Sequence, residues 1–128
     1  MIVDSSAMIA GILREPGWEG IIRKLAEAST VGAGAPTLAE TGLVLTAKIG
    51  PKALALLSRF LREVDLVVIP FGEAHWPVAV EAYARFGKGR HAAGLNFGDC
   101  LTYAVARRAD QPLLFVGNDF AKTDIAAA

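Results

Sequence analysis

Short apolar runs that suit buried strands alternate along this chain with longer segments of helical periodicity. The strand patterns lie at residues 1–4, 30–35, 66–69 and 112–116. The run at 66–69 is the clearest, because continuous β-branched residues are typical of strands buried in a parallel sheet. Strands that alternate with helices predict an α/β fold with a mainly parallel central sheet. We therefore expect a three-layer α/β/α sandwich, folded as one domain over residues 1–128.

Helical patterns fill the segments between these strands, at 5–13, 18–28, 37–47, 52–63, 73–86 and from 96 onward. Ser5 or Ser6 is expected to cap the first helix, and residues 37–40 match a capping box. In the fourth helix the inward positions are expected to be Leu54, Leu57 and Leu61. Pro77 is compatible with the fifth helix only within its first turn.

Composition limits the classes of protein that this chain can belong to. Apolar residues make up 53% and the mean hydropathy is +0.40, which indicates a sheet covered on both faces, a surface reserved for a partner, or both. Thirteen basic and thirteen acidic residues cancel, so no overall field favours nucleic acid. No run reaches the ~20 apolar residues of a membrane span. The single Cys100 forms no internal disulfide and fits a reducing cytoplasm.

The segment from Asn96 to Ala106 predicts a helix with one carboxylate in its first turn. Asn96 is a preferred N-cap residue, and Asp99 lies where the helix dipole favours an anion. Asp99 could serve only as half of a capping box. A carboxylate at the start of an otherwise apolar helix is nevertheless costly to desolvate unless a cation meets it.

Four acidic residues map to the carboxyl ends of the expected strands, where open α/β sheets bind ligands. They are Asp4, Glu40, Asp99 and Asp119. Each has an ordinary alternative as a helix cap or turn residue. Together they would repel one another unless a cation or a shifted pKa relieved the charge. An oxygen-only set of ligands favours Mg²⁺ or Mn²⁺, which can activate water and neutralise a phosphoryl group.

A basic loop precedes the helix that begins near Asn96. Residues 82–98 contain no acid, while Arg85, Lys88, Arg90 and His91 are potential phosphate or RNA contacts. The alternative is a solvated loop with incidental charge. Neither a dinucleotide fingerprint nor a P-loop is present, which leaves nucleotide-binding folds without support.

Taken together, these motifs resemble a known family. The segments 2–7, 95–100, 114–120 and 123–125, with Glu40 near the start of its helix, resemble PIN-domain ribonucleases, and more narrowly the VapC toxins of bacterial toxin–antitoxin pairs. The resemblance implies a Mg²⁺- or Mn²⁺-dependent endoribonuclease. Asp4 and Asp99 would be the firmest metal ligands, Asp119 would complete the set, and Glu40 would bind metal or orient the water. Ser6 and Asn96 would hold the carboxylates by hydrogen bonds.

The resemblance also implies partners: an RNA substrate, a second copy in a homodimer, and an antitoxin whose tail lies in a groove near the acidic centre. Apolar residues of the first two helices could line that groove, or could be core: Met8, Ile9, Ile12, Trp18 and Ile22. Two other functions stay open. One is a catalytically idle module that binds a protein partner, and the other, less favoured by the short chain, is a DNA flap-type nuclease.

Overall fold

The computed structural model describes all of residues 1–128. Its strands are β1 (Ile2–Val3), β2 (Gly32–Gly34), β3 (Val67–Ile69) and β4 (Leu113–Leu114). Its α-helices are α1 (Ser5–Leu13), α2 (Trp18–Glu27), α3 (Ala35–Ile49), α4 (Ala53–Glu63), α5 (Trp76–Phe86) and α6 (Phe97–Ala109). Two 3-10 turns, η1 (Gly50–Lys52) and η2 (Phe120–Lys122), complete the chain.

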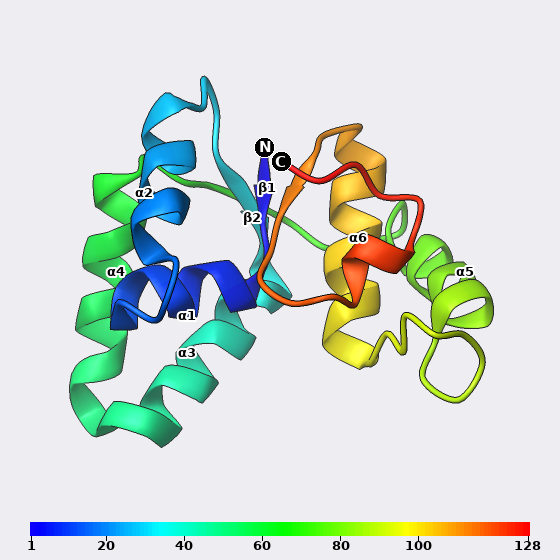
Figure 1. Ribbon diagram of the computed structural model, residues 1–128, viewed down its shortest axis with the longest axis horizontal. Helices are drawn as coiled ribbons and strands as arrows, with labels where there is room; N and C mark the ends of the chain where they lie inside the picture. Colours follow the sequence, from blue (N-terminus) through cyan, green and yellow to red (C-terminus); the bar gives the residue numbers. More distant parts are fainter.

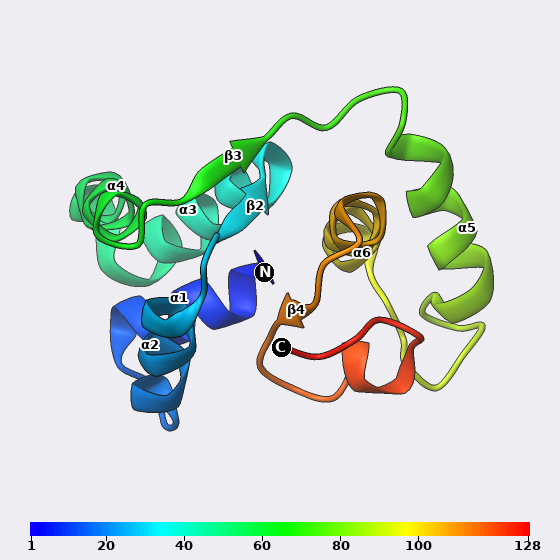
Figure 2. The same ribbon diagram turned by 90° about the horizontal axis from the view of Figure 1, so that it is seen from above.

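The four strands form one sheet in the order β3-β2-β1-β4, and every pair is parallel. In the centre, Ile2 lies in register with Gly32 on one side and Leu113 on the other. At the β4 edge, Leu113 also pairs with Ala127 of the C-terminal segment. β3 forms the opposite edge (Figure 2). The parallel sheet expected from the alternating pattern is confirmed.

Helices cover both faces of the sheet (Figure 1). Ile2 and Leu113 pack against α5 and α6, whereas their neighbours Val3 and Leu114 pack against α1, α2 and α4 on the other face. This division follows from the alternation of side chains along a strand. The predicted three-layer α/β/α architecture is confirmed.

The last residue of β2, Gly34, has no side chain because α6 passes very close to it. A Cβ atom at Gly34 would lie 2.9 Å from Cγ2 of Val105. That separation is shorter than ordinary van der Waals contact allows, so a side chain at position 34 would push α6 away from the sheet. Because Gly34 is the last residue of β2, α6 crosses the sheet at the carboxyl end of that strand.

Two helix starts differ from those predicted. Asp4, not Ser5 or Ser6, is the N-cap of α1 and accepts a hydrogen bond from the Ser6 amide. α3 begins at Ala35 after Gly34, with no side-chain cap, so the predicted capping box at 37–40 is wrong. The reason is Pro36, whose missing N–H is tolerated in the first turn and lets the helix start earlier. Pro77 lies in the first turn of α5, as predicted.

Burial differs from prediction at β3 and α4. Val67 and Val68 are 51% and 50% exposed, because β3 is an edge strand and not a strand buried on both faces. In α4 the buried face is formed by Ala53, Leu57 and Phe60, whereas Leu54 is 70% exposed. None of the helices has the length and apolar character that a membrane crossing requires.

Candidate active site

The structure brings the four predicted acidic residues to one edge of the sheet. Asp4 follows β1, Glu40 lies in α3, Asp99 is in the first turn of α6, and Asp119 precedes η2 in the loop after β4. The charges of Asp4, Asp119 and Glu40 all act on Asp99. None of these side chains takes part in an ion pair. We refer to these four residues as the acidic edge.

Asp99 has a strongly perturbed pKa. Partial burial raises the pKa of Asp99 to about 6, and the negative charges of the other three carboxylates add to this effect. The hydrogen bond from the Asn96 backbone works in the opposite direction. Perturbed carboxyl groups of this kind concentrate at functional sites, because ordinary surface acids are solvated or paired.

Asp4 is buried and held through Ser6. Oδ2 of Asp4 accepts hydrogen bonds from the Ser6 amide at 3.1 Å and the Ser6 hydroxyl at 2.6 Å. The Ser6 hydroxyl oxygen in turn accepts a bond from the Val116 amide at 3.0 Å. Ser6 therefore ties Asp4 to the segment that leads from β4 to Asp119.

Asp99 is held by the capping box that the sequence predicted. Oδ1 of Asn96 accepts from the Asp99 amide at 2.9 Å, and Oδ2 of Asp99 accepts from the Asn96 amide at 3.1 Å. Asp99 is thus both part of the helix cap and a member of the acidic edge. The cap fixes the side chain of Asp99 relative to the helix axis.

Glu40 lies directly against the backbone of Gly98. A Cβ atom at position 98 would overlap Oε2 of Glu40 and would lie 3.0 Å from Oε1. Only glycine therefore lets this carboxylate approach the first turn of α6. Sequence reasoning missed Gly98, although a glycine inside the first turn of an apolar helix was a signal of close approach.

A buried hydrogen bond between Thr37 and Thr102 fixes α3 against α6. Their hydroxyl oxygens are 3.0 Å apart, and both side chains are buried. Thr37 lies one turn before Glu40 and Thr102 one turn after Asp99. This pair, also missed from the sequence, sets the separation of the two helices that carry those carboxylates.

A cleft of about 580 Å³ opens beside Glu40 between α3 and α6, with Asn96 and Phe97 on its α6 side. Its volume is in the range of small-ligand sites. The donors of the acidic edge are all carboxylate oxygens, which suit a hard divalent cation such as Mg²⁺ or Mn²⁺. No three His, Cys, Asp or Glu side chains converge closely enough to enclose an ion, so the acidic edge is an open arrangement.

The predicted basic residues lie between α5 and α6 or at the end of α5. Lys88 and Arg90 are exposed, and the Arg90 guanidinium lies 5.6 Å from the Tyr83 ring. Nδ1 of His91 accepts a hydrogen bond from the Ala93 amide at 3.0 Å. Arg85 differs from the others, since its guanidinium is already paired with Asp124 at 3.1 Å.

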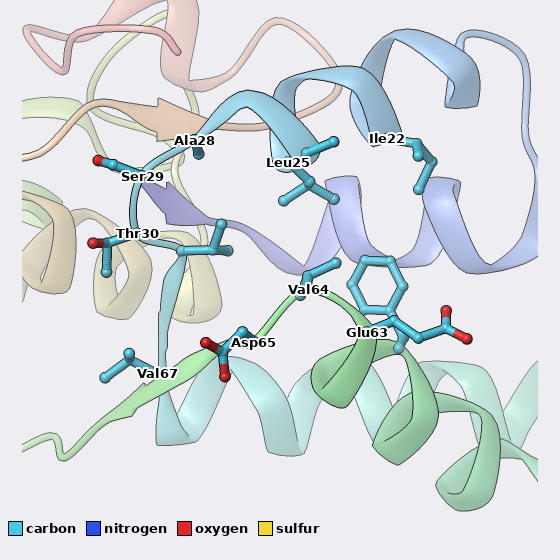
Figure 3. A pocket seen from close by; sticks show the side chains of 12 residues that line it. Ile22, Leu25, Ala28, Ser29, Thr30, Glu63, Val64, Asp65 and Val67 are labelled. Atoms are coloured by element: carbon cyan, nitrogen blue, oxygen red, sulfur yellow. The ribbon is translucent and has the colours of Figure 1, made fainter.

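The predicted groove residues divide into two groups. Met8 and Ile9 are core. Ile12, Trp18 and Ile22 line a hollow of about 340 Å³ between the first two helices and α4. A second hollow of about 540 Å³ shares Ile22 with it and continues toward the start of β2. Figure 3 shows Ile22 and Leu25 on the α2 side of this second hollow and Val64 at its opposite side.

Comparison with known proteins identifies relatives over nearly the whole chain. The family model of the PIN domain matches residues 1–126. The chain is 47% identical over 126 residues to the protein named ribonuclease VapC36 of Mycobacterium tuberculosis, a match that covers 98% of this chain and 91% of the relative. It is 35% identical to ribonuclease VapC of Mycolicibacterium smegmatis, with 99% and 98% covered.

Two solved structures share the fold. VapC20 of Mycobacterium tuberculosis, a toxin that cleaves the sarcin–ricin loop, superposes with a TM-score of 0.80 at 19% identity, covering 99% of this chain and 97% of the other. VapBC2 of Rickettsia felis, bound to a promoter DNA fragment, gives 0.78 at 16% identity, covering 99% and 96%. With the family model and the close relatives, these likenesses show that the chain belongs to the PIN-domain family, among its VapC members.

Proposed function

We propose that this protein is a Mg²⁺- or Mn²⁺-dependent endoribonuclease that acts as the toxin of a type II toxin–antitoxin pair. The observation that carries the proposal is the acidic edge: four carboxylates from separate parts of the chain, without a cationic partner, one of them with its pKa raised to about 6. The relatives that share the fold and much of the sequence are named ribonucleases. Unneutralised carboxylates in a partly buried site favour binding of a divalent cation.

In this proposal Asp4 and Asp99 hold the cation, Asp119 completes the ligand set, and Glu40 binds it or orients the attacking water. When bound, the cation would activate water and neutralise charge on the phosphodiester. Ser6 holds the Asp4 carboxylate through its hydroxyl and its amide, and Asn96 holds the Asp99 carboxylate through its backbone amide.

We assign substrate binding to the basic residues that lead into α6. Lys88, Arg90 and His91 lie in the loop between α5 and α6, which ends at the Asn96 cap. A nucleic acid whose phosphates contact this loop would lie on the side from which the chain enters α6 and reaches Asp99. Such contacts position a nucleic acid without reading its sequence. Arg85 could add to them only with the donors that its pairing with Asp124 leaves free.

The test is cleavage of total cellular RNA by the purified protein with Mg²⁺, with Mn²⁺ and with EDTA. Asp99→Asn and Asp4→Asn should lower cleavage by about 100-fold or more, while circular dichroism shows an unchanged fold. Asp110→Asn, which removes an exposed carboxylate at the other end of α6, is the matched control. Cleavage that persists in EDTA or in the Asp99→Asn variant would overturn the proposal.

A catalytically idle binding module is the second candidate, favoured by the apolar hollows around Ile22. It predicts no RNA cleavage with either metal, and a stable complex with a protein partner as the only function. In the toxin proposal the same hollows receive the antitoxin. The smaller one has a mainly apolar lining and Arg59 there is already paired with Glu63 at 2.9 Å, so the fitting segment is mainly apolar. Ile22→Asp should abolish co-purification with a co-expressed antitoxin while RNA cleavage is retained.

We also propose a homodimer and a cytoplasmic location. α5 and the first turn of α6 expose large apolar side chains around a hollow of about 400 Å³ with a wholly apolar lining: Trp76 (56%), Val80 (62%) and Phe97 (76%). Contiguous apolar surface of this kind marks protein interfaces. Val80→Glu should convert a dimer to a monomer in sedimentation experiments.

A buried free Cys100 and an RNA substrate both suit the cytoplasm.

A further inference from the structure

The segment that carries Asp119 is fastened on both sides. On its N-terminal side the Val116 amide donates to Ser6, which also binds Asp4. Between this point and η2, Gly117, Asn118 and Asp119 are exposed and make no side-chain hydrogen bonds. The position of Asp119 therefore depends on what holds the chain after it.

After Asp119 the chain is held as one unit up to Asp124. Phe120 is buried in the α5–α6 side of the core, with its ring 5.4 Å from that of Phe115. The Thr123 hydroxyl donates to the Phe120 carbonyl at 2.7 Å, and the Ile125 amide donates to the Thr123 hydroxyl oxygen at 3.2 Å. Movement of Asp124 would thus be transmitted to Phe120 and to its neighbour Asp119.

Asp124 is the point at which this unit is bound to the helices. Its Oδ1 accepts a hydrogen bond from the Tyr103 hydroxyl at 2.6 Å, and its Oδ2 is paired with Arg85 at 3.1 Å and Arg107 at 3.7 Å. Desolvation works against the charge of Asp124, but the bonds from Tyr103 and Arg85 outweigh it and lower the pKa of Asp124. Both oxygens are therefore engaged by groups of α5 and α6.

We infer that Asp124 is a positioning residue that holds Asp119 at the acidic edge by fastening the following segment to α5 and α6. It is not itself a ligand, because its two oxygens are occupied by Tyr103 and two arginines. It also gives Arg85 a role other than contact with RNA. The inference rests on the proposed function in one respect, the assignment of Asp119 to a cation.

The experiment measures Mn²⁺ binding to the metal-free protein by titration calorimetry. Asp124→Ala should weaken Mn²⁺ binding about 10-fold. Tyr103→Phe, which removes one hydroxyl from a buried ring and keeps the fold, should weaken Mn²⁺ binding less. The Mn²⁺ affinity of Asp124→Asn should lie between those of the other two variants. Asp110→Asn is again the matched control. In an Asp119→Asn background, Asp124→Ala should cause no further loss, because residues that act as one unit are not additive.

Hydrogen exchange gives a reading that needs neither metal nor RNA. The hydrogen-bonded amides of Lys122, Thr123 and Ile125 should exchange faster in Asp124→Ala than in the wild type, while the amides of α1 and α2 stay unchanged. Wild-type Mn²⁺ affinity in Asp124→Ala and Tyr103→Phe would overturn the inference, as would an equal loss in both Asp119 backgrounds. If Mn²⁺ binding follows the expected pattern but RNA is not cleaved, the nuclease proposal fails and the inference stands.

Discussion

At the residue scale, one missing side chain at Gly98 decides how close Glu40 can come to Asp99. Gly98→Ala should keep or raise stability, because alanine is favoured over glycine in helices by about 1 kcal/mol and the group that must move is the end of a flexible side chain. RNA cleavage should nevertheless fall by about 10-fold or more, because the Glu40 carboxylate is displaced. Thermal unfolding and the cleavage rate, measured on the same sample, check both parts.

Gly20→Ala in α2 is the matched control, because a Cβ there would meet nothing within 4 Å. It should gain the same helix propensity with no change in cleavage. Full activity in Gly98→Ala would show that the proximity of Glu40 and Gly98 has no part in the reaction.

The residues of the acidic edge could be predicted from sequence because their signals are local. Asp4 ends an apolar run, and Asp99 stands three residues after a preferred cap. Gly98 and Asp124 could not be assigned in the same way. A short window can single out a glycine within a helix, as at Gly98, but the roles of both residues depend on Glu40 and Tyr103, which lie in other elements, and local sequence does not identify such partners.

At the element scale, the buried Thr37–Thr102 bond joins the two helices of the cleft. Thr102→Val leaves the Thr37 hydroxyl buried without its partner and should lower the free energy of unfolding by about 1–3 kcal/mol. The double variant with Thr37→Val should be less destabilised than the sum of the single variants, because apolar groups of the same shape replace both partners. Urea denaturation measures all three.

Thr46→Val serves as the control, since Thr46 is an exposed α3 residue whose hydroxyl bonds only within its own helix. Its effect should stay within about 0.5 kcal/mol. Strict additivity of the two buried substitutions would mean that the hydroxyls do not depend on each other.

At this scale the sequence predicted correctly which strands and helices follow one another along the chain. It did not predict correctly which side chains of these elements are buried. The alternation of apolar runs is a property of the chain itself, whereas the exposure of Val67 depends on β3 lying at an edge. The prediction that Leu54 points inward was wrong for a related reason, because Ala53 and Leu57 form the face of α4 that meets the core.

At the scale of the whole molecule, folding partly buries Asp99 and gathers the like charges of the acidic edge around it. The pKa of Asp99 is about 6 in the folded protein against 3.8 as its ordinary value, so the folded state binds a proton more tightly between pH 4 and 6. Asp99 therefore contributes a loss of stability as the pH rises through that window. For this partly exposed group the contribution is on the order of 1 kcal/mol after solvent screening.

Asp99→Asn should accordingly stabilise the metal-free protein more at pH 7.5 than at pH 4, in urea denaturation with EDTA. Asn keeps an acceptor for the Asn96 amide, so the capping geometry is retained. Mn²⁺ at pH 7.5 should stabilise the wild type and leave Asp99→Asn nearly unchanged. An equal increase in the free energy of unfolding at both pH values would contradict the conclusion that the charged form of Asp99 destabilises the folded protein.

The order of the strands also leaves the two borders of the sheet unequal. The chain itself covers β4, where Leu113 pairs with Ala127, while β3 has no strand beside it on its outer side. An uncovered border is where sheets of different molecules add to one another and aggregate. Here β3 is only three residues long and Pro70 follows it at once, so a foreign strand finds few backbone groups to pair with. The short length of β3 and the proline that follows it thus disfavour aggregation through this edge of the sheet.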